Sequence, residues 1–283
     1  MRFITFYEIF FRHRIKKAKL ILKIYIYLTI YIKYLINLIY LPKKINLDQL
    51  NINEDSKINE LSKLFDYFNS DKGDYFENQY VHPMKRNLQK IQGHGYAKIY
   101  EKYFHNFRDK NINIMEIGSF YGNASAALFF YFKKSNIYAG DIFPDLFRYK
   151  SKRILNFYVN SSDEKSIKDN IIDKFDNKFD IIIEDASHYL KDQIISLFMI
   201  FRKLNKGGLF IVEELDFPDT RHDANKFNEK PTLKELLLSF KQKNFDIESK
   251  YSSKVDKKYF IENLKDINIY RGNFNEVAII EKK

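Results

Sequence analysis

Residues 113–125 decide the fold of this chain, and their sequence is Asn113-Ile114-Met115-Glu116-Ile117-Gly118-Ser119-Phe120-Tyr121-Gly122-Asn123-Ala124-Ser125. An apolar run that ends in Gly and continues through small residues is typical of a strand, a tight turn and a helix. Because glycine has no Cβ, the backbone N–H groups of such a turn can approach a ligand closely. We therefore predict a strand-turn-helix junction that binds a ligand at its turn.

A carboxylate ends the next apolar run, Ile137-Tyr138-Ala139-Gly140-Asp141. Asp141 follows Glu116 by 25 positions, where a carboxylate can accept hydrogen bonds from both hydroxyls of a ribose. The glycines of the junction have the spacing G-x-x-x-G, and the dinucleotide fingerprint G-x-G-x-x-G is absent. The pattern therefore favours S-adenosylmethionine over NAD as the bound nucleoside cofactor.

Short β-rich runs alternate with helical ones from residue 113 onward. The strand candidates are 113–118, 136–141, 154–159, 179–184 and 208–214. This alternation predicts an α/β fold with a parallel, doubly wound, Rossmann-like sheet. The tail changes character, because 245–251, 267–270 and 276–281 are strand-like and a hairpin-length loop covers 271–275. An antiparallel edge of the sheet is expected there.

Acidic residues end two of the predicted strands. The run Phe179-Asp180-Ile181-Ile182-Ile183 continues into Glu184-Asp185-Ala186-Ser187-His188, and the run that ends at Val212 continues into Glu213-Glu214. Ligands of open α/β sheets bind at the carboxyl ends of the strands, and crowded carboxylates there favour a bound cation. Asp185, Glu213 and Glu214 suit Mg²⁺ or Mn²⁺, and His188 lies within reach of such an ion. In the alternative interpretation, Glu184 and Glu213 cap helices or pair with lysines.

The charge of the chain is concentrated at its N-terminus. Residues 1–44 contain ten Lys or Arg against one acid, Glu8, whereas the remaining 239 residues contain 38 basic and 36 acidic ones. A nearly neutral body argues against nucleic acid as a partner, while the basic segment suits an anionic surface. The chain has no Cys, which excludes disulfides, thiolate nucleophiles and Cys-ligated zinc.

The basic N-terminal segment contains a long apolar stretch, residues 18–41. At 100° per residue, Lys16, Lys19 and Lys23 project to one side and Leu28, Ile32 and Leu35 to another, as in an amphipathic helix. Three interpretations remain open: a helix that lies on a membrane surface, a helix that spans the membrane, and a helix packed within a homo-oligomer. A cofactor made in the cytosol places the body in the cytoplasm, at the cytoplasmic face of a membrane.

Taken together, these elements resemble the class I S-adenosylmethionine-dependent methyltransferases. More narrowly, they are similar to the metal-dependent sugar O-methyltransferases of the macrocin and mycinamicin type, which act on deoxysugars of macrolides and related glycosides. The resemblance covers residues 60–283 and leaves the N-terminal arm outside. It rests on Ser70-Asp71-Lys72-Gly73, His94-Gly95-Tyr96 with Tyr100, Glu116-Ile117-Gly118, Asp141-Ile142, residues 179–188 and residues 207–215.

The resemblance implies a seven-stranded sheet with a reversed last strand, and it implies roles for individual residues. The predicted cofactor-binding residues are Glu116, Gly118, Ser119, Tyr121, Asp141, Ile142, Asp163 and Glu184, with Asp163 near the adenine. Asp185, Glu213 and Glu214 match the metal ligands of the family. His188 and Asp185 are the predicted catalytic residues, with His188 as the general base.

These expectations combine into one functional hypothesis with one alternative. The chain is expected to be a Mg²⁺-dependent O-methyltransferase that acts on a sugar or glycoconjugate, with a basic amphipathic arm (1–45), a helical cap (46–110) and a cofactor-binding catalytic domain (111–283). The alternative is a protein that keeps the fold without catalysis and serves as a scaffold at a membrane surface.

Overall fold

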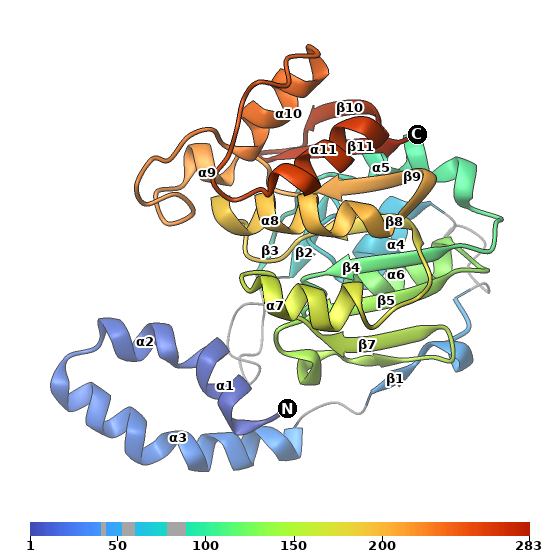
Figure 1. Cartoon of the computed structure of the whole chain (residues 1–283). Helices are drawn as coiled ribbons and strands as arrows, with labels where there is room; N and C mark the ends of the chain where they lie inside the picture. Colours follow the sequence, from blue (N-terminus) through green and yellow to red (C-terminus); the bar gives the residue numbers. More distant parts are fainter. Residues whose placement is uncertain (41–43, 53–59, 78–88) are drawn as a thin grey trace.

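A seven-stranded mixed sheet forms the centre of the molecule in the computed structural model, which describes residues 1–40, 44–52, 60–77 and 89–283 (Figure 1). The strand order is β10-β11-β9-β8-β4-β5-β7. Neighbouring strands from β9 to β7 pair in parallel, whereas β11 runs antiparallel to both β9 and β10. The predicted α/β, Rossmann-like class is therefore confirmed.

The sheet strands are β4 (Asn113–Ile117), β5 (Asn136–Asp141), β7 (Ile154–Tyr158), β8 (Phe179–Glu184), β9 (Leu204–Val212), β10 (Leu264–Arg271) and β11 (Glu276–Lys282). The helices of the body are α4 (Leu61–Tyr67), α5 (Ala97–Phe104), α6 (Asn123–Tyr131), α7 (Glu164–Ile167), α8 (Leu190–Ile200), α9 (Phe217–Thr220), α10 (Leu233–Lys241) and α11 (Lys254–Asn263). Two small sheets flank them, one from β1 (Ile45–Asn46) and β6 (Tyr149–Lys150), the other from β2 (Tyr75–Glu77) and β3 (Lys90–Gln92).

Successive residues of the central strands enter two different cores, because side chains of a strand alternate between its faces. Ile114 and Ile181 pack with α4, α5 and α6 on one face, and Met115 and Ile182 pack with α7, α8, α10 and α11 on the other. Both faces are thus covered, which is typical of a parallel sheet. Figure 1 shows α7 and α8 in front of the sheet and α4 and α6 behind it.

The N-terminal arm folds as a helical hairpin outside this sandwich. It consists of α1 (Phe3–Phe10), α2 (Arg12–Lys17) and α3 (Leu20–Tyr40), with a small core of its own around Phe6, Phe10 and Ile30. Figure 1 shows the hairpin below the sheet. α1 contacts the body where the Thr5 hydroxyl donates a 3.0 Å hydrogen bond to Asp145. In the part of the chain that the structure describes, no helix is long and apolar enough to cross a membrane.

Four predicted strands, 113–118, 136–141, 154–159 and 179–184, agree with the structure to within a residue, whereas β9 covers 204–212 instead of 208–214 and the tail differs further. Residues 245–251 form no strand, because they lead from α10 to α11, and the last two strands extend over 264–271 and 276–282. A hairpin joins these strands, closed by a 2.8 Å bond from the Gly272 N–H to the Asn275 carbonyl. Residues 53–59 and 78–88 of the predicted cap, and 41–43 of the predicted arm, lie outside the described residues.

Candidate active site

The turn after β4 takes the conformation that its glycines allow. Gly118 has φ +92°, and a Cβ there would lie 1.9 Å from the backbone oxygen of Asp185. Gly122 has φ +81° and directly precedes α6, whose first residue is Asn123. Only glycine fits the first position, because a side chain would collide with the loop that follows the neighbouring strand β8.

A cavity of about 430 Å³ opens at this turn. Asp141, at the end of β5, lines it and accepts backbone hydrogen bonds from Phe120 at 2.8 Å and Phe143 at 2.7 Å. Glu116 lines the same cavity, is buried, and accepts a hydrogen bond from the Ser125 hydroxyl of α6. Burial raises the pKa of Glu116 to about 7, against the opposing effect of the Lys72 ammonium.

Most of the predicted site residues line this cavity, and three do not. The lining includes Glu116, Gly118, Ser119, Tyr121, Asp141, Ile142, Asp185, His188 and Glu214. Asp163, Glu184 and Glu213 are outside it. The arm contributes two further lining residues that were absent from the predicted site, Glu8 and Ile9 of α1.

The two predicted cofactor residues outside the cavity have other surroundings. Asp163 is the N-cap of α7, where its carboxylate accepts a 3.0 Å hydrogen bond from the Lys165 N–H. Glu184 is still part of β8, so its side chain points to the same face as Ile182, toward the core below α8. Its carboxylate is completely buried, and burial raises the pKa of Glu184 to about 7.

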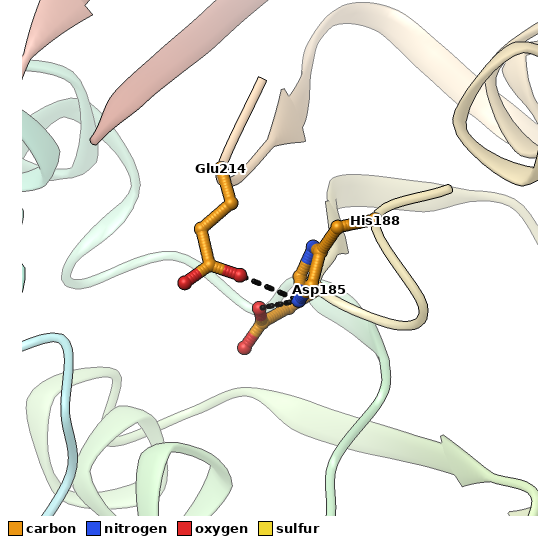
Figure 2. A group of neighbouring side chains, drawn as sticks. All are labelled: Asp185, His188 and Glu214. Carbon is orange, nitrogen blue, oxygen red and sulfur yellow. Dashed lines mark ion pairs between the residues drawn. The ribbon is translucent and has the colours of Figure 1, made fainter. Parts of the chain in front are cut away.

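Asp185, His188 and Glu214 converge at the edge of the cavity, and Figure 2 shows their side chains pointing toward one another. One ligand atom from each lies within 4.8 Å of the others. His188 Nε2 is 2.5 Å from Glu214 Oε2 and 3.7 Å from Asp185 Oδ1. The two carboxylates offer the oxygen ligands that suit a divalent cation such as Mg²⁺ or Mn²⁺, and the imidazole lies beside them.

Glu213, the third predicted metal ligand, is not among the residues whose ligand atoms converge there. Its Oε1 atom lies 2.8 Å from the Lys72 ammonium and accepts a hydrogen bond from the Tyr100 hydroxyl. Burial and the nearby Asp185 charge raise the pKa of Glu213, while Lys72 and Tyr100 act against that rise. The structure therefore shows, for Glu213, the pairing with lysine that the sequence left open as an alternative.

Strain and charge are both concentrated at His188. His188 and Glu214 have φ values of +57° and +50°, which few residues other than glycine adopt. Burial lowers the pKa of His188, but the carboxylates of Glu214 and Asp185 outweigh it and raise the pKa to about 9. The imidazole is therefore protonated at neutral pH as long as these carboxylates carry their full charge.

The His188 to Glu214 pair is expected to stabilise the metal-free fold in a pH-dependent way. Because the pKa of His188 is raised in the folded state, the stabilisation is complete below pH 6.5 and is lost as the pH rises through about 9. In EDTA, His188→Asn should lower the free energy of unfolding by about 3 kcal/mol at pH 6 and by much less at pH 10. Urea unfolding at both pH values measures this, and an equal loss at both would contradict it.

Two loops that the resemblance singled out pair with each other and place side chains that were missing from the predicted site. The His94 N–H donates to the Asp71 carbonyl at 2.7 Å, and the Tyr96 N–H donates to the Lys72 carbonyl at 3.0 Å. His94 Nε2 thereby lies 3.1 Å from Glu214 Oε1. Lys72 belongs to the motif 70–73 and His94 to the motif 94–96. Membership of these motifs was the one feature of the sequence that pointed to either residue.

A second cavity, of about 680 Å³, adjoins the first. The two share Asp71, Ala186, His188 and Glu214 as lining residues. Aromatic side chains form much of the wall of the second cavity, namely Phe76, Tyr189, Phe217 and Phe274. Two ligands could therefore meet at His188 and Glu214, one from each cavity.

No family model matches the chain, but individual proteins do. The 8-demethyl-8-alpha-L-rhamnosyl tetracenomycin-C 2'-O-methyltransferase of Streptomyces olivaceus is 32% identical over 129 residues, which is 43% of this chain and 33% of that protein. The solved structure of the MycE methyltransferase of the mycinamycin biosynthetic pathway, in complex with Mg and SAH, matches with a TM-score of 0.58 and 20% identity. A MycE complex that also contains Mycinamycin VI matches with a TM-score of 0.56 and 20% identity.

These matches establish the fold. Both MycE matches cover 79% of this chain and 54% of MycE, so the chain spans about half of MycE and a third of the tetracenomycin enzyme. The chain has the fold of a class I S-adenosylmethionine-dependent methyltransferase. Within that class, it is similar in sequence to an O-methyltransferase whose name specifies a rhamnosyl group.

Proposed function

We propose that this protein is an S-adenosylmethionine-dependent O-methyltransferase that uses Mg²⁺ or Mn²⁺ and methylates a hydroxyl of a sugar or glycoconjugate. One observation carries the proposal: two cavities meet at His188 and Glu214, one beside the glycine turn and Asp141, the other lined by aromatic side chains. Such walls suit the apolar faces of a sugar ring or an aglycone. The tetracenomycin and MycE enzymes support the choice of a glycoside as acceptor.

The first cavity suits S-adenosylmethionine. Asp141 faces it from the end of β5, where the two hydroxyls of a ribose can reach the carboxylate. Gly118 keeps the turn free of a side chain, so that the cofactor can lie close to the backbone. Acidic residues outnumber Lys72 and His188 in the lining of the cavity, and this excess of negative charge favours a sulfonium over an uncharged cofactor.

The reaction we propose is an in-line displacement. The acceptor oxygen forms a bond to the methyl carbon, the bond from that carbon to sulfur breaks, and S-adenosylhomocysteine leaves. His188 Nε2 receives the proton of the acceptor hydroxyl, and Glu214, 2.5 Å away, stabilises the imidazolium. Asp185 and Glu214 would hold a divalent cation, which would offset the carboxylate charge and so lower the pKa values of His188 and of the acceptor hydroxyl.

Transfer of a labelled methyl group from S-adenosylmethionine to a panel of glycosides tests this function, with and without EDTA. We expect transfer to at least one glycoside and its loss in EDTA. Calorimetry with S-adenosylhomocysteine distinguishes an active methyltransferase from a scaffold that keeps the fold without catalysis. Absence of binding, with or without Mg²⁺, would contradict the proposal and favour the scaffold.

We further propose that the arm, residues 1–45, binds an anionic membrane surface. α3 buries Ile26 and Ile30 against the rest of the hairpin but exposes a long apolar face, formed by Leu20, Ile21, Ile24, Leu28, Ile32, Leu35, Leu38 and Ile39. Exposed cations lie on α2 and directly before α3, namely Arg12, Arg14, Lys16, Lys17 and Lys19. An apolar face beside a basic cluster is typical of helices that lie in the interface of anionic lipids.

Substitution of the exposed face of α3 is expected to weaken membrane binding. Ile21→Ser combined with Leu28→Ser removes two of the most exposed apolar side chains, 84% and 73% accessible. Burial of each is worth about 1.5–3 kcal/mol, so the pair should lower partition into phosphatidylserine vesicles at least tenfold in a flotation assay. Phe227→Ser, which removes an exposed ring outside the arm, is the matched control. Unchanged flotation, or a wild-type dimer that the double substitution dissociates, would contradict the membrane assignment.

A further inference from the structure

Lys72 is a completely buried lysine at the centre of the candidate active site. Its side chain is 1% exposed, although it belongs to a loop between α4 and β2. The pairing of this loop with residues 93–96 fixes its backbone, and a Cβ on Gly93 would lie 2.3 Å from the Gly73 oxygen. The close approach of two loops thus holds Lys72 inside the molecule rather than at its surface.

The Lys72 ammonium contacts three carboxylates that come from three different strand ends. It donates a hydrogen bond to Asp185 Oδ2, lies 2.8 Å from Glu213 Oε1, and lies 3.8 Å from Glu116 Oε1. Burial disfavours the charged ammonium, but these carboxylates outweigh burial and raise the pKa of Lys72. A buried charge is retained when it is paired in this way.

These contacts also determine which oxygen atoms remain available for other ligands. Asp185 uses Oδ2 for Lys72, while its Oδ1 atom points toward His188 at 3.7 Å. Glu213 is held by Lys72 together with Tyr100, and Glu116 faces the cofactor cavity. Without the ammonium, three carboxylates would repel one another, and their side chains would turn apart or take up protons.

We propose that Lys72 is the positioning residue of the metal site: it fixes Asp185 and Glu213 so that Asp185 presents one oxygen atom to a divalent cation. This inference rests on the proposed function, because it assumes that Asp185 binds the cation. Loss of an outer partner of a metal ligand costs about 10–100-fold in metal affinity. Charge balance alone predicts the opposite result, a higher metal affinity without Lys72, because loss of the ammonium would leave more negative charge to attract the divalent cation.

The experiment compares Mn²⁺ binding, measured by calorimetry and by electron paramagnetic resonance, in the wild type and in Lys72→Met. We expect the dissociation constant to rise 10–100-fold in Lys72→Met. Lys98→Met, which removes an exposed lysine of α5, should leave it unchanged. An unchanged or tighter affinity in folded Lys72→Met would overturn the inference. If the wild type did not bind Mn²⁺, the result would instead contradict the proposal that the enzyme uses a divalent cation.

The absence of native cysteine allows a chemical rescue of the ammonium. Lys72→Cys can be alkylated with 2-bromoethylamine in the unfolded state and then refolded, which restores an ammonium at nearly the original length. Recovery of Mn²⁺ affinity in the alkylated protein supports the positioning role, and its absence in a folded product contradicts it. If the neutral variants do not fold, Lys72→Arg keeps the charge and alters the geometry. It should fold with weakened Mn²⁺ binding, and an unchanged affinity would contradict the inference.

Discussion

His188→Asn should lower kcat for methyl transfer by about 10²–10⁴, which is the contribution of a positioned general base. His188 Nε2 is the one ring atom that contacts both carboxylates, and it lies where the two cavities meet. Asparagine is the appropriate replacement because residue 188 has φ +57°, and asparagine tolerates this conformation better than glutamine or alanine. The measurement is the initial rate of labelled methyl transfer at saturating cofactor.

Cofactor binding serves as the control for this substitution. The glycine turn and Asp141 do not depend on the imidazole, so His188→Asn should change the dissociation constant of S-adenosylhomocysteine less than threefold. Full activity in His188→Asn would exclude His188 as the base. Loss of both activity and cofactor binding would indicate that the variant damages the fold rather than the chemistry.

Gly118→Ala is expected to lower the free energy of unfolding by more than about 4 kcal/mol, or to prevent folding. The new Cβ would lie 1.9 Å from the backbone oxygen of Asp185, so either the turn or the loop at 185–188 must move. That loop has little freedom, because the Asp185 N–H donates to the Ile117 carbonyl at 2.9 Å and the Ser187 hydroxyl donates to Asp192 at 2.5 Å. Urea unfolding measures the effect.

Gly207→Ala is a matched control for this prediction. Gly207 also has a positive φ, +72°, but a Cβ there would meet no atom within 4 Å. Gly207→Ala should therefore cost only the backbone strain, about 1–2 kcal/mol. The difference between the two variants isolates the collision at Gly118. If the two variants were equally destabilised, the positive φ alone would explain why residue 118 must be glycine, and the proximity of the loop after β8 would not.

The central strands could be predicted from the sequence because their signals are local. Apolar runs of five or six residues that end in glycine or a carboxylate indicate a buried strand wherever they occur, and β4, β5 and β8 lie within a residue of their predicted bounds. Residues 245–251 were wrongly predicted as a strand. Their apolar residues alternate, but the helices α10 and α11 on either side leave them as a connection.

The candidate site could be predicted only in part. The sequence locates the acidic residues at the strand ends, but it does not show which side chains contact them. Asp185, His188 and Glu214 converge because parallel strands bring their carboxyl ends to one edge. Glu213, in contrast, is adjacent to Glu214 in sequence and yet faces Lys72 and Tyr100. β9 ends at Val212 and Glu214 has a φ of +50°, so the chain turns between the two acids and their carboxylates have different partners.

The strand-turn-helix junction at 113–125 and the carboxylates at the ends of β5, β8 and β9 could be recognised from the sequence alone, because glycine spacing and apolar periodicity are properties of neighbouring residues. The packing of the chain was needed to see which carboxylates converge with His188, that three carboxylates contact Lys72, and that α1 of the arm lines the cavity beside the glycine turn. The contacts of Lys72 with Asp185 and Glu213, and the approach of α1 to the cavity, join residues more than a hundred positions apart. A sequence does not specify such pairings locally, since they arise when the loops and strand ends are packed against one another.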